Sequence, residues 1–273
     1  MTVAEIRVSP EWLHLREAAD ATARSLVLVE RLRGHLPATG PRVIHDLACG
    51  SGAMGRWLAP LLPGRQHWVL HDRDGDLLER AAADRPGPAA DGARVGVETR
   101  CSDITRLDPG DLAGADLITA SALLDLLTRE ELDRLIGACA EAACPVLLAL
   151  SVAGRVELAP AHPLDARVAA AFDAHQRRMT PGGRPLGPDA AATAAAGFRA
   201  TGADVIVQPS PWRLGPAQAD LTAEWLGGWV EAACEQDATL AAAADAYTRR
   251  RLAQGRSGQL SVTVAHADLL VLP

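Results

Sequence analysis

The sequence predicts an α/β protein in which helices cover both faces of a mostly parallel sheet. Between Arg42 and Val152, short apolar runs alternate with helical stretches, a spacing typical of βαβ units. A Gly-rich turn follows the first of these apolar runs. The 273 residues fit one domain with insertions better than two domains, and 48% hydrophobic with 22% charged residues is an ordinary globular composition.

The N-terminal segment, residues 1–40, is expected to form a helical lid. Ser9 and Pro10 are suited to the N-cap and first position of a helix, and Gly34 to its end. Apolar residues between them recur at near-helical spacing. We therefore expect one helix from Ser9 to Gly34.

The central part of the chain is expected to supply five strands and three helices. Thr128 and Glu131 form a capping-box pattern, and Pro145 follows the helix that this pattern begins. The strands are expected at 43–47, 67–71, 95–101, 116–120 and 146–152, and the helices at 53–62, 74–83 and 128–143.

The C-terminal part is less regular. Two further strands, at 205–207 and 260–264, bring the number to seven, and the last of them could resume at 269–272. Residues 41–273 are expected to form one domain with helical insertions at about 160–200 and 211–258. The helices are expected at 164–179, 188–200, 221–234 and 238–253.

Composition excludes several functions. The chain has no Lys, so all 27 basic residues are Arg, and Schiff-base and P-loop chemistry that needs Lys is excluded. The net charge of −7 disfavours a nucleic-acid partner. The five Cys form no zinc-ligand spacing, no run of 18 apolar residues predicts a membrane span, and the start MTVAEIRVSP lacks a signal-peptide pattern. We expect a cytoplasmic protein, and the Ala, Gly and Arg bias suggests a bacterial source.

The Gly-rich turn predicts a nucleotide-type cofactor and leaves two candidates. Gly50, Gly52 and Gly55 satisfy GxGxxG, and Asp72 lies about 20 residues on, which would suit a dinucleotide oxidoreductase using NAD(P). However, Asp46 ends the preceding strand, where an acid suits a cationic ligand rather than a pyrophosphate. Asp103 follows the third strand and could accept a hydrogen bond from an adenine amine.

At these residues the chain resembles the class I S-adenosylmethionine-dependent methyltransferases. The resemblance covers about 42–152 and rests on Asp46-Leu-Ala-Cys-Gly-Ser-Gly, Asp72, Ser102-Asp103-Ile104 and the fourth strand from Asp116. One departure is Ala48, where the family often has glycine. Alanine is a tolerable substitute if this position does not need a positive φ.

The resemblance implies a three-layer Rossmann-like fold, S-adenosylmethionine as cofactor and S-adenosylhomocysteine as product. It implies that the loop holds the methionine portion, that Asp72 with Arg73 binds the ribose, that Asp103 and Ile104 frame the adenine, and that Ser121 lies near the methyl group. Alternatively, Asp72 could only cap a helix and Asp103 could be a turn residue. The implied cofactor residues are Asp46, Ala48, Gly50, Gly52, Asp72, Arg73, Asp103, Ile104 and Ser121.

Candidates for the acceptor side come from several segments. Asp125 lies in an apolar run after the fourth strand, and His175 has a side chain suited to act as a base near neutral pH, so these two are the catalytic candidates. Each could instead be a surface or packing residue. The substrate candidates are His14, Arg178 and Trp212. Trp225 and Trp229 lie on one helix face, which either packs on the core or caps a planar acceptor. No metal site is expected, since His266 and Asp268 are too few ligands.

We therefore predict a methyltransferase that acts on a small molecule, with oxygen as the predicted acceptor atom. The alternatives are an NAD(P)-dependent oxidoreductase and a member of the fold that binds the cofactor without transferring methyl groups. The expected partner is a small-molecule substrate, with neither nucleic acid nor membrane. The N-terminal helix could pack on its own domain or on a second copy of the chain, which leaves a homodimer open.

Overall fold

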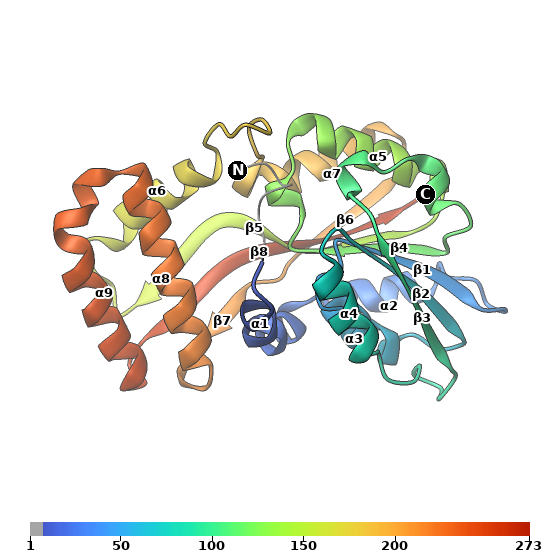
Figure 1. Cartoon of the computed structure of the whole chain (residues 1–273), viewed down its shortest axis with the longest axis horizontal. Coiled ribbons are helices and arrows are strands. Elements are labelled where there is room, and N and C mark those ends of the chain that lie inside the picture. Colours follow the sequence, from blue (N-terminus) through green and yellow to red (C-terminus); the bar gives the residue numbers. More distant parts are fainter. Residues whose placement is uncertain (1–7) are drawn as a thin grey trace.

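The computed structural model describes residues 8–273, which fold into three layers (Figure 1). Helices α5 and α7 cover one face of a central sheet, and α2, α3 and α4 cover the other. The strands of the described chain are β1 (Arg42–Leu47), β2 (Gln66–Asp72), β3 (Val95–Cys101), β4 (Leu117–Ser121), β5 (Val146–Ala159), β6 (Asp204–Pro209), β7 (Trp212–Leu214) and β8 (Ser261–Leu272). The layer helices are α2 (Leu26–Arg33), α3 (Ala53–Leu58), α4 (Gly75–Ala83), α5 (Arg129–Ala142) and α7 (Ala190–Ala200).

The sheet has the order β3-β2-β1-β4-β5-β8-β6, which confirms the predicted Rossmann-like class. β1 to β5 pair in parallel, and β8 runs antiparallel between β5 and β6. β7, which pairs with the first half of β8, was not predicted because three residues are too short to show a period. The carboxyl ends of the parallel strands meet at one edge, the usual place for a ligand in such sheets.

The N-terminal helix is broken in two, contrary to the single helix expected from Ser9 to Gly34. Ser9 caps α1 (Pro10–Ala23) as predicted, because its side chain accepts a hydrogen bond from the Trp12 backbone at 3.0 Å. The chain then leaves the helix at Arg24, and Ser25 caps α2. The predicted lid segment also includes residues 1–7, which lie outside the described residues.

Strands β5 and β8 continue together beyond the main sheet and carry a helical cap (Figure 1). The cap consists of α6 (Asp165–Gln176), α8 (Ala219–Gln236) and α9 (Ala241–Arg256), packed with β7 around buried side chains such as Trp229 and Tyr247. Of the segment expected to be one insertion at 160–200, α6 packs against α8, whereas α7 packs on α5 and the main sheet. None of the helices in residues 8–273 combines the length and the apolarity needed to cross a membrane.

A single buried carboxylate fixes the junction between the main sheet and the cap. Asp268, on β8, is 1% exposed and accepts three hydrogen bonds. The donors are the backbone N–H of Ser25 and of Leu150, each at 2.8 Å, and the Ser210 hydroxyl at 2.5 Å. Leu150 has a φ of 57° within a register shift of β5, so Asp268 stabilises an unfavourable backbone conformation where β5 turns toward the cap.

Replacing Asp268 is expected to destabilise the whole chain. Asp268→Ala leaves three donors without their acceptor and should lower the free energy of unfolding by about 3 kcal/mol or more, as measured by urea denaturation. Ser210→Ala, which removes one donor only, should cost about 1 kcal/mol. Equal, small losses for the two variants would contradict this role for Asp268.

Candidate active site

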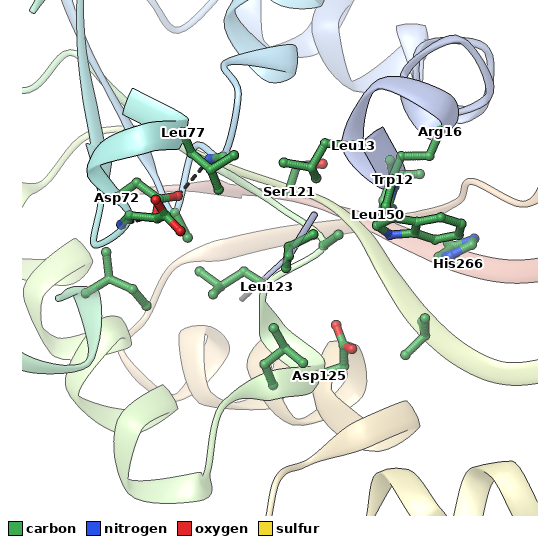
Figure 2. Close-up of a pocket in the computed structure, with 18 of the residues that line it drawn as sticks. Trp12, Leu13, Arg16, Asp72, Leu77, Ser121, Leu123, Asp125, Leu150 and His266 are labelled. Carbon is green, nitrogen blue, oxygen red and sulfur yellow. Dashed lines mark hydrogen bonds between the residues drawn. The ribbon is translucent and has the colours of Figure 1, made fainter. Parts of the chain in front are cut away.

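The main cavity has a volume of about 370 Å³ and lies at the carboxyl ends of the parallel strands, between α1 and the cap (Figure 2). Figure 2 shows Asp72 and Leu77 on one side of it, and Trp12, Arg16 and His266 on the other. Seven of the nine predicted cofactor residues line this cavity, and Asp46 and Gly52 do not. The seven are Ala48, Gly50, Asp72, Arg73, Asp103, Ile104 and Ser121.

The loop after β1 has a backbone that favours glycine at three positions. Gly50 and Gly52 have φ angles of 55° and 86°, and a Cβ on Gly50 would lie 3.2 Å from a methyl carbon of Leu13 on α1. Ala48 has a φ of 50°. Alanine would be a tolerable substitute for glycine only if this position did not need a positive φ, and it does. The position requires the left-handed conformation, and the chain adopts it with a residue that carries a Cβ.

Ala48→Gly is therefore expected to stabilise the protein. Removing the Cβ relieves a strain of about 1–2 kcal/mol, part of which is offset by the greater freedom of glycine in the unfolded chain, for a net gain of about 0.5–1 kcal/mol. The matched control is Ala140→Gly, in the exposed helical part of α5, which should cost about 1 kcal/mol. Chemical denaturation of both variants would test whether the free energy of unfolding rises for Ala48→Gly and falls for Ala140→Gly.

Asp72 joins the Gly-rich loop to the loop after β2. Its carboxylate accepts hydrogen bonds from the backbone N–H of Gly50 at 2.8 Å and of Asp74 at 3.0 Å. Asp74 itself is the N-cap of α4, so capping that helix does not account for Asp72. Since Asp72 is 8% exposed and lines the cavity, its remaining lone pairs can reach a ligand there.

Asp103 is a turn residue that also lines the cavity. Its side chain accepts hydrogen bonds from the backbone N–H and the hydroxyl of Thr105, at 3.0 and 2.8 Å, as a turn residue does. It also lines the cavity beside Ile104, which is 8% exposed. The turn therefore holds an acid and an apolar side chain next to each other, in the arrangement expected of an adenine site.

Behind Ser121, two buried charged groups have polar atoms without a hydrogen-bond partner in the described residues. Asp46 accepts from the Thr119 hydroxyl at 2.7 Å through Oδ1, but its Oδ2 has no partner, and burial raises its pKa to about 7. Arg24 donates to the Ser121 hydroxyl at 3.1 Å, while its Nε and Nη1 are buried without partners. Sequence reasoning missed Arg24, because only the folded chain brings residue 24 next to residue 121.

The structure separates the predicted acceptor-side residues. Asp125 and Trp212 line the main cavity, and burial raises the pKa of Asp125. His175 and Arg178 do not line it: both bind Glu235, at 3.0 and 2.7 Å, beside a smaller cavity of about 180 Å³ that shares only Asp125 and Leu126 with the main one.

The remaining candidates are His14 and the pair formed by Trp225 and Trp229. His14 is exposed on α1 and does not line the main cavity. Trp225 and Trp229 stack at 5.1 Å in the cap, and Trp225 lines the main cavity. The face that these two residues share therefore both packs in the cap and borders the cavity.

Arg16 and His266 are cavity residues that the sequence analysis did not select. Arg16 follows Trp12 by four residues on α1, and both line the cavity. The sequence suggests His266 only as a partner of Asp268 in a metal pair. The carboxylate of Asp268 instead accepts hydrogen bonds from three donors of the protein. The alternation of buried Val264, His266 and Asp268 along β8 is the signal that could have placed His266 inside. Residues 8–273 contain no group of three side chains arranged to hold a metal ion.

Helix α1 is held over the Gly-rich loop by an ion pair. Glu17 on α1 accepts from Nε and Nη2 of Arg56 on α3, each at 2.7 Å, and Arg56 also donates to the Ser51 carbonyl at 2.6 Å. The hydrogen bonds from Arg56 lower the pKa of Glu17 below its ordinary value of 4.5. The pair therefore contributes its stabilisation above that pH and loses it as the pH falls through the folded-state pKa.

Glu17→Gln is expected to loosen α1 without unfolding the protein. Loss of a partly exposed ion pair worth about 1 kcal/mol should raise the hydrogen-exchange rate of α1 amides about fivefold at neutral pH. Glu11→Gln, in the exposed first turn of the same helix, is the control and should leave the rates unchanged. Equal exchange in both variants would mean that Glu17 does not hold the helix.

Comparison with known proteins identifies the class of this domain. Residues 44–145 match the family model described as a methyltransferase domain. This match confirms the prediction of a class I methyltransferase domain, with S-adenosylmethionine as its cofactor. No curated protein matches the chain in sequence.

Solved structures resemble the chain in fold. The cyclopropane synthase MmaA2 from Mycobacterium tuberculosis is 12% identical, with a TM-score of 0.50 over 97% of this chain and 94% of that one. A mycolic acid cyclopropane synthase, CmaA1 in its apo form, is 14% identical, with a TM-score of 0.49 over 97% and 100%. A methyltransferase from Geobacter sulfurreducens in complex with S-adenosylhomocysteine is 14% identical, with a TM-score of 0.43 over 98% and 100%. At these identities the likeness concerns the fold alone.

Proposed function

We propose that this protein transfers a methyl group from S-adenosylmethionine to an oxygen atom of a small-molecule acceptor. The observation that carries the proposal is the continuity of the main cavity, which runs from the Gly-rich loop to the aromatic side chains of α1, β7 and α8. One chamber can therefore hold both reactants and exclude water from them, which is the principal task of a protein in this reaction.

The residues around the loop would suit the groups of the cofactor, which supports this proposal. Behind the residues that line the cavity, the donors of Arg24 and the oxygen of Asp46 that have no hydrogen-bond partner among residues 8–273 would complement the carboxylate and the ammonium group of the methionine portion. Asp72 would accept hydrogen bonds from ribose hydroxyls, with Arg73 beside it, and Asp103 with Ile104 would frame the adenine. When bound, S-adenosylmethionine supplies an electrophilic methyl group on a sulfonium.

The far half of the cavity is suited to an apolar or planar acceptor. Trp12, Trp212, Trp225 and Phe172 line it together, and such side chains bind flat molecules with little loss of conformational entropy. Asp125 faces this half, and its raised pKa would help it to hold or accept a proton. Of the two predicted catalytic residues, we propose Asp125 rather than His175 as the base in this half, because His175 lines the smaller cavity and not the main one.

The proposal also assigns a lid and a catalytic domain to the two parts of the chain. Residues 1–40 would act as a lid over a methyltransferase domain formed by residues 41–273, and the acceptor would be the principal partner. We propose no nucleic-acid partner, since the net charge of −7 would repel phosphates. A cytoplasmic location and a homodimer remain parts of the proposal.

Two variants and two ligands test the cofactor assignment. 5′-Methylthioadenosine lacks the amino-acid portion of S-adenosylhomocysteine. We expect Arg24→Met to weaken binding of S-adenosylhomocysteine about tenfold and to leave 5′-methylthioadenosine unchanged, whereas Asp72→Asn weakens both, as measured by isothermal titration. Asp76→Asn, an exposed acid on α4, is the control and should change neither.

The same titration separates the competing functions. Binding of NAD(P)H, with no binding of S-adenosylmethionine, would contradict the proposal and favour an oxidoreductase. Binding of S-adenosylmethionine without methyl transfer to any of a broad panel of hydroxylated acceptors would favour a member of the fold that does not methylate.

A further inference from the structure

The acceptor half of the cavity has one wall that carries both a hydrogen-bond donor and a hydrogen-bond acceptor. Arg16 and His266 contact the same indole: the Arg16 guanidinium carbon lies 4.9 Å from the centre of the Trp212 ring, and the His266 ring centre lies 5.2 Å from it. Both residues line the cavity, and Figure 2 shows them on the same side.

Arg16 is held in place with one nitrogen unused. Its Nε and Nη2 donate to Asp20 at 2.9 and 3.3 Å, and the same carboxylate accepts from the Trp212 indole at 2.9 Å. Within residues 8–273, no hydrogen bond engages the Nη1 of Arg16. Asp20 thus fixes the guanidinium and the indole relative to each other, and leaves N–H groups for an oxygen atom of a ligand.

His266 presents a lone pair to the cavity. Its Nδ1 lies 3.0 Å from the Val264 carbonyl oxygen, which can only accept, so Nδ1 carries the proton and Nε2 is the acceptor. Burial, together with the charge of Arg16, lowers the pKa of His266 to about 4, which keeps the ring neutral at physiological pH. No hydrogen bond from the described residues occupies Nε2.

We infer that the acceptor is a planar molecule that carries a hydroxyl and, on the same edge, an anionic or carbonyl oxygen, with the hydroxyl bound by His266 Nε2 and the other oxygen by Arg16 Nη1. This inference rests on the proposed function and specifies its substrate class. A protonated amine does not suit this wall, because it has no lone pair with which to accept the free N–H of Arg16.

The same contact gives the proton of the reaction a destination. As the hydroxyl oxygen forms its bond to the methyl carbon, the carbon–sulfur bond breaks and its electron pair stays on sulfur. The oxygen becomes strongly acidic only as this bond forms, so the weakly basic Nε2 of His266 suffices to take its proton and later release it to water.

A matched pair of probes tests the inference on the full chain. 1-Hydroxy-2-naphthoate has both groups, and 2-naphthoate lacks the hydroxyl. With saturating S-adenosylhomocysteine, we expect the hydroxy acid to bind about tenfold more tightly. His266→Leu should abolish the difference, and His266→Gln, which retains an acceptor, should restore part of it. Arg16→Gln should weaken both acids about tenfold, and Arg129→Gln, an exposed arginine on α5, should change neither.

The outcomes distinguish this inference from the proposed function. If S-adenosylhomocysteine binds but the two acids bind equally, or if His266→Leu leaves their difference intact, the inference is wrong and the cofactor assignment stands. If the acids bind through Arg16 and His266 while S-adenosylhomocysteine does not bind, the subsite stands and the transferase proposal falls.

Discussion

The carboxylate of Asp268 is the contact on which the arrangement of this molecule most depends. Its three donors belong to the start of α2, the irregular turn of β5 at Leu150 and the loop between β6 and β7. Each of these segments changes direction at that point. Burying a carboxylate costs free energy unless its oxygens accept hydrogen bonds. The three donors of Asp268 must therefore stay close to it, and this fixes the direction of all three segments relative to one another. The cap, the N-terminal helices and the sheet are thereby fixed around the space that becomes the cavity.

The position of the cavity follows from this junction. The parallel strands bring the Gly-rich loop, Asp72 and Asp103 to one edge, as any sheet of this kind does. The acceptor side has a different origin, because β5 and β8 continue past the sheet and carry Trp225 and His266 to face that edge. The parallel strands of the sheet supply one half of the cavity, and the extension of β5 and β8 supplies the other.

That most of the proposed cofactor residues line one cavity could be predicted from the sequence, because these residues lie at or near strand ends. Asp72, Asp103 and Ser121 each follow or end an apolar run, and the sheet order then places them together. Arg24 could not be found in this way, since its place beside Ser121 depends on contacts with residues far away in the sequence, and His266 lies within a strand rather than at its end, where only the alternation along β8 points to it. The strain at Ala48 was also hidden, because a backbone angle is set by the folded loop rather than by the residue that occupies it.

Helix α1 contacts both halves of the cavity, with Leu13 against Gly50 and Trp12 with Arg16 in the wall of the acceptor half. A displacement of this one helix would uncover both halves at the same time. Under the proposed function, α1 would act as a lid for both halves. Entry and release of the two reactants would then be coupled events, and the opening rate of α1 would set an upper limit on turnover.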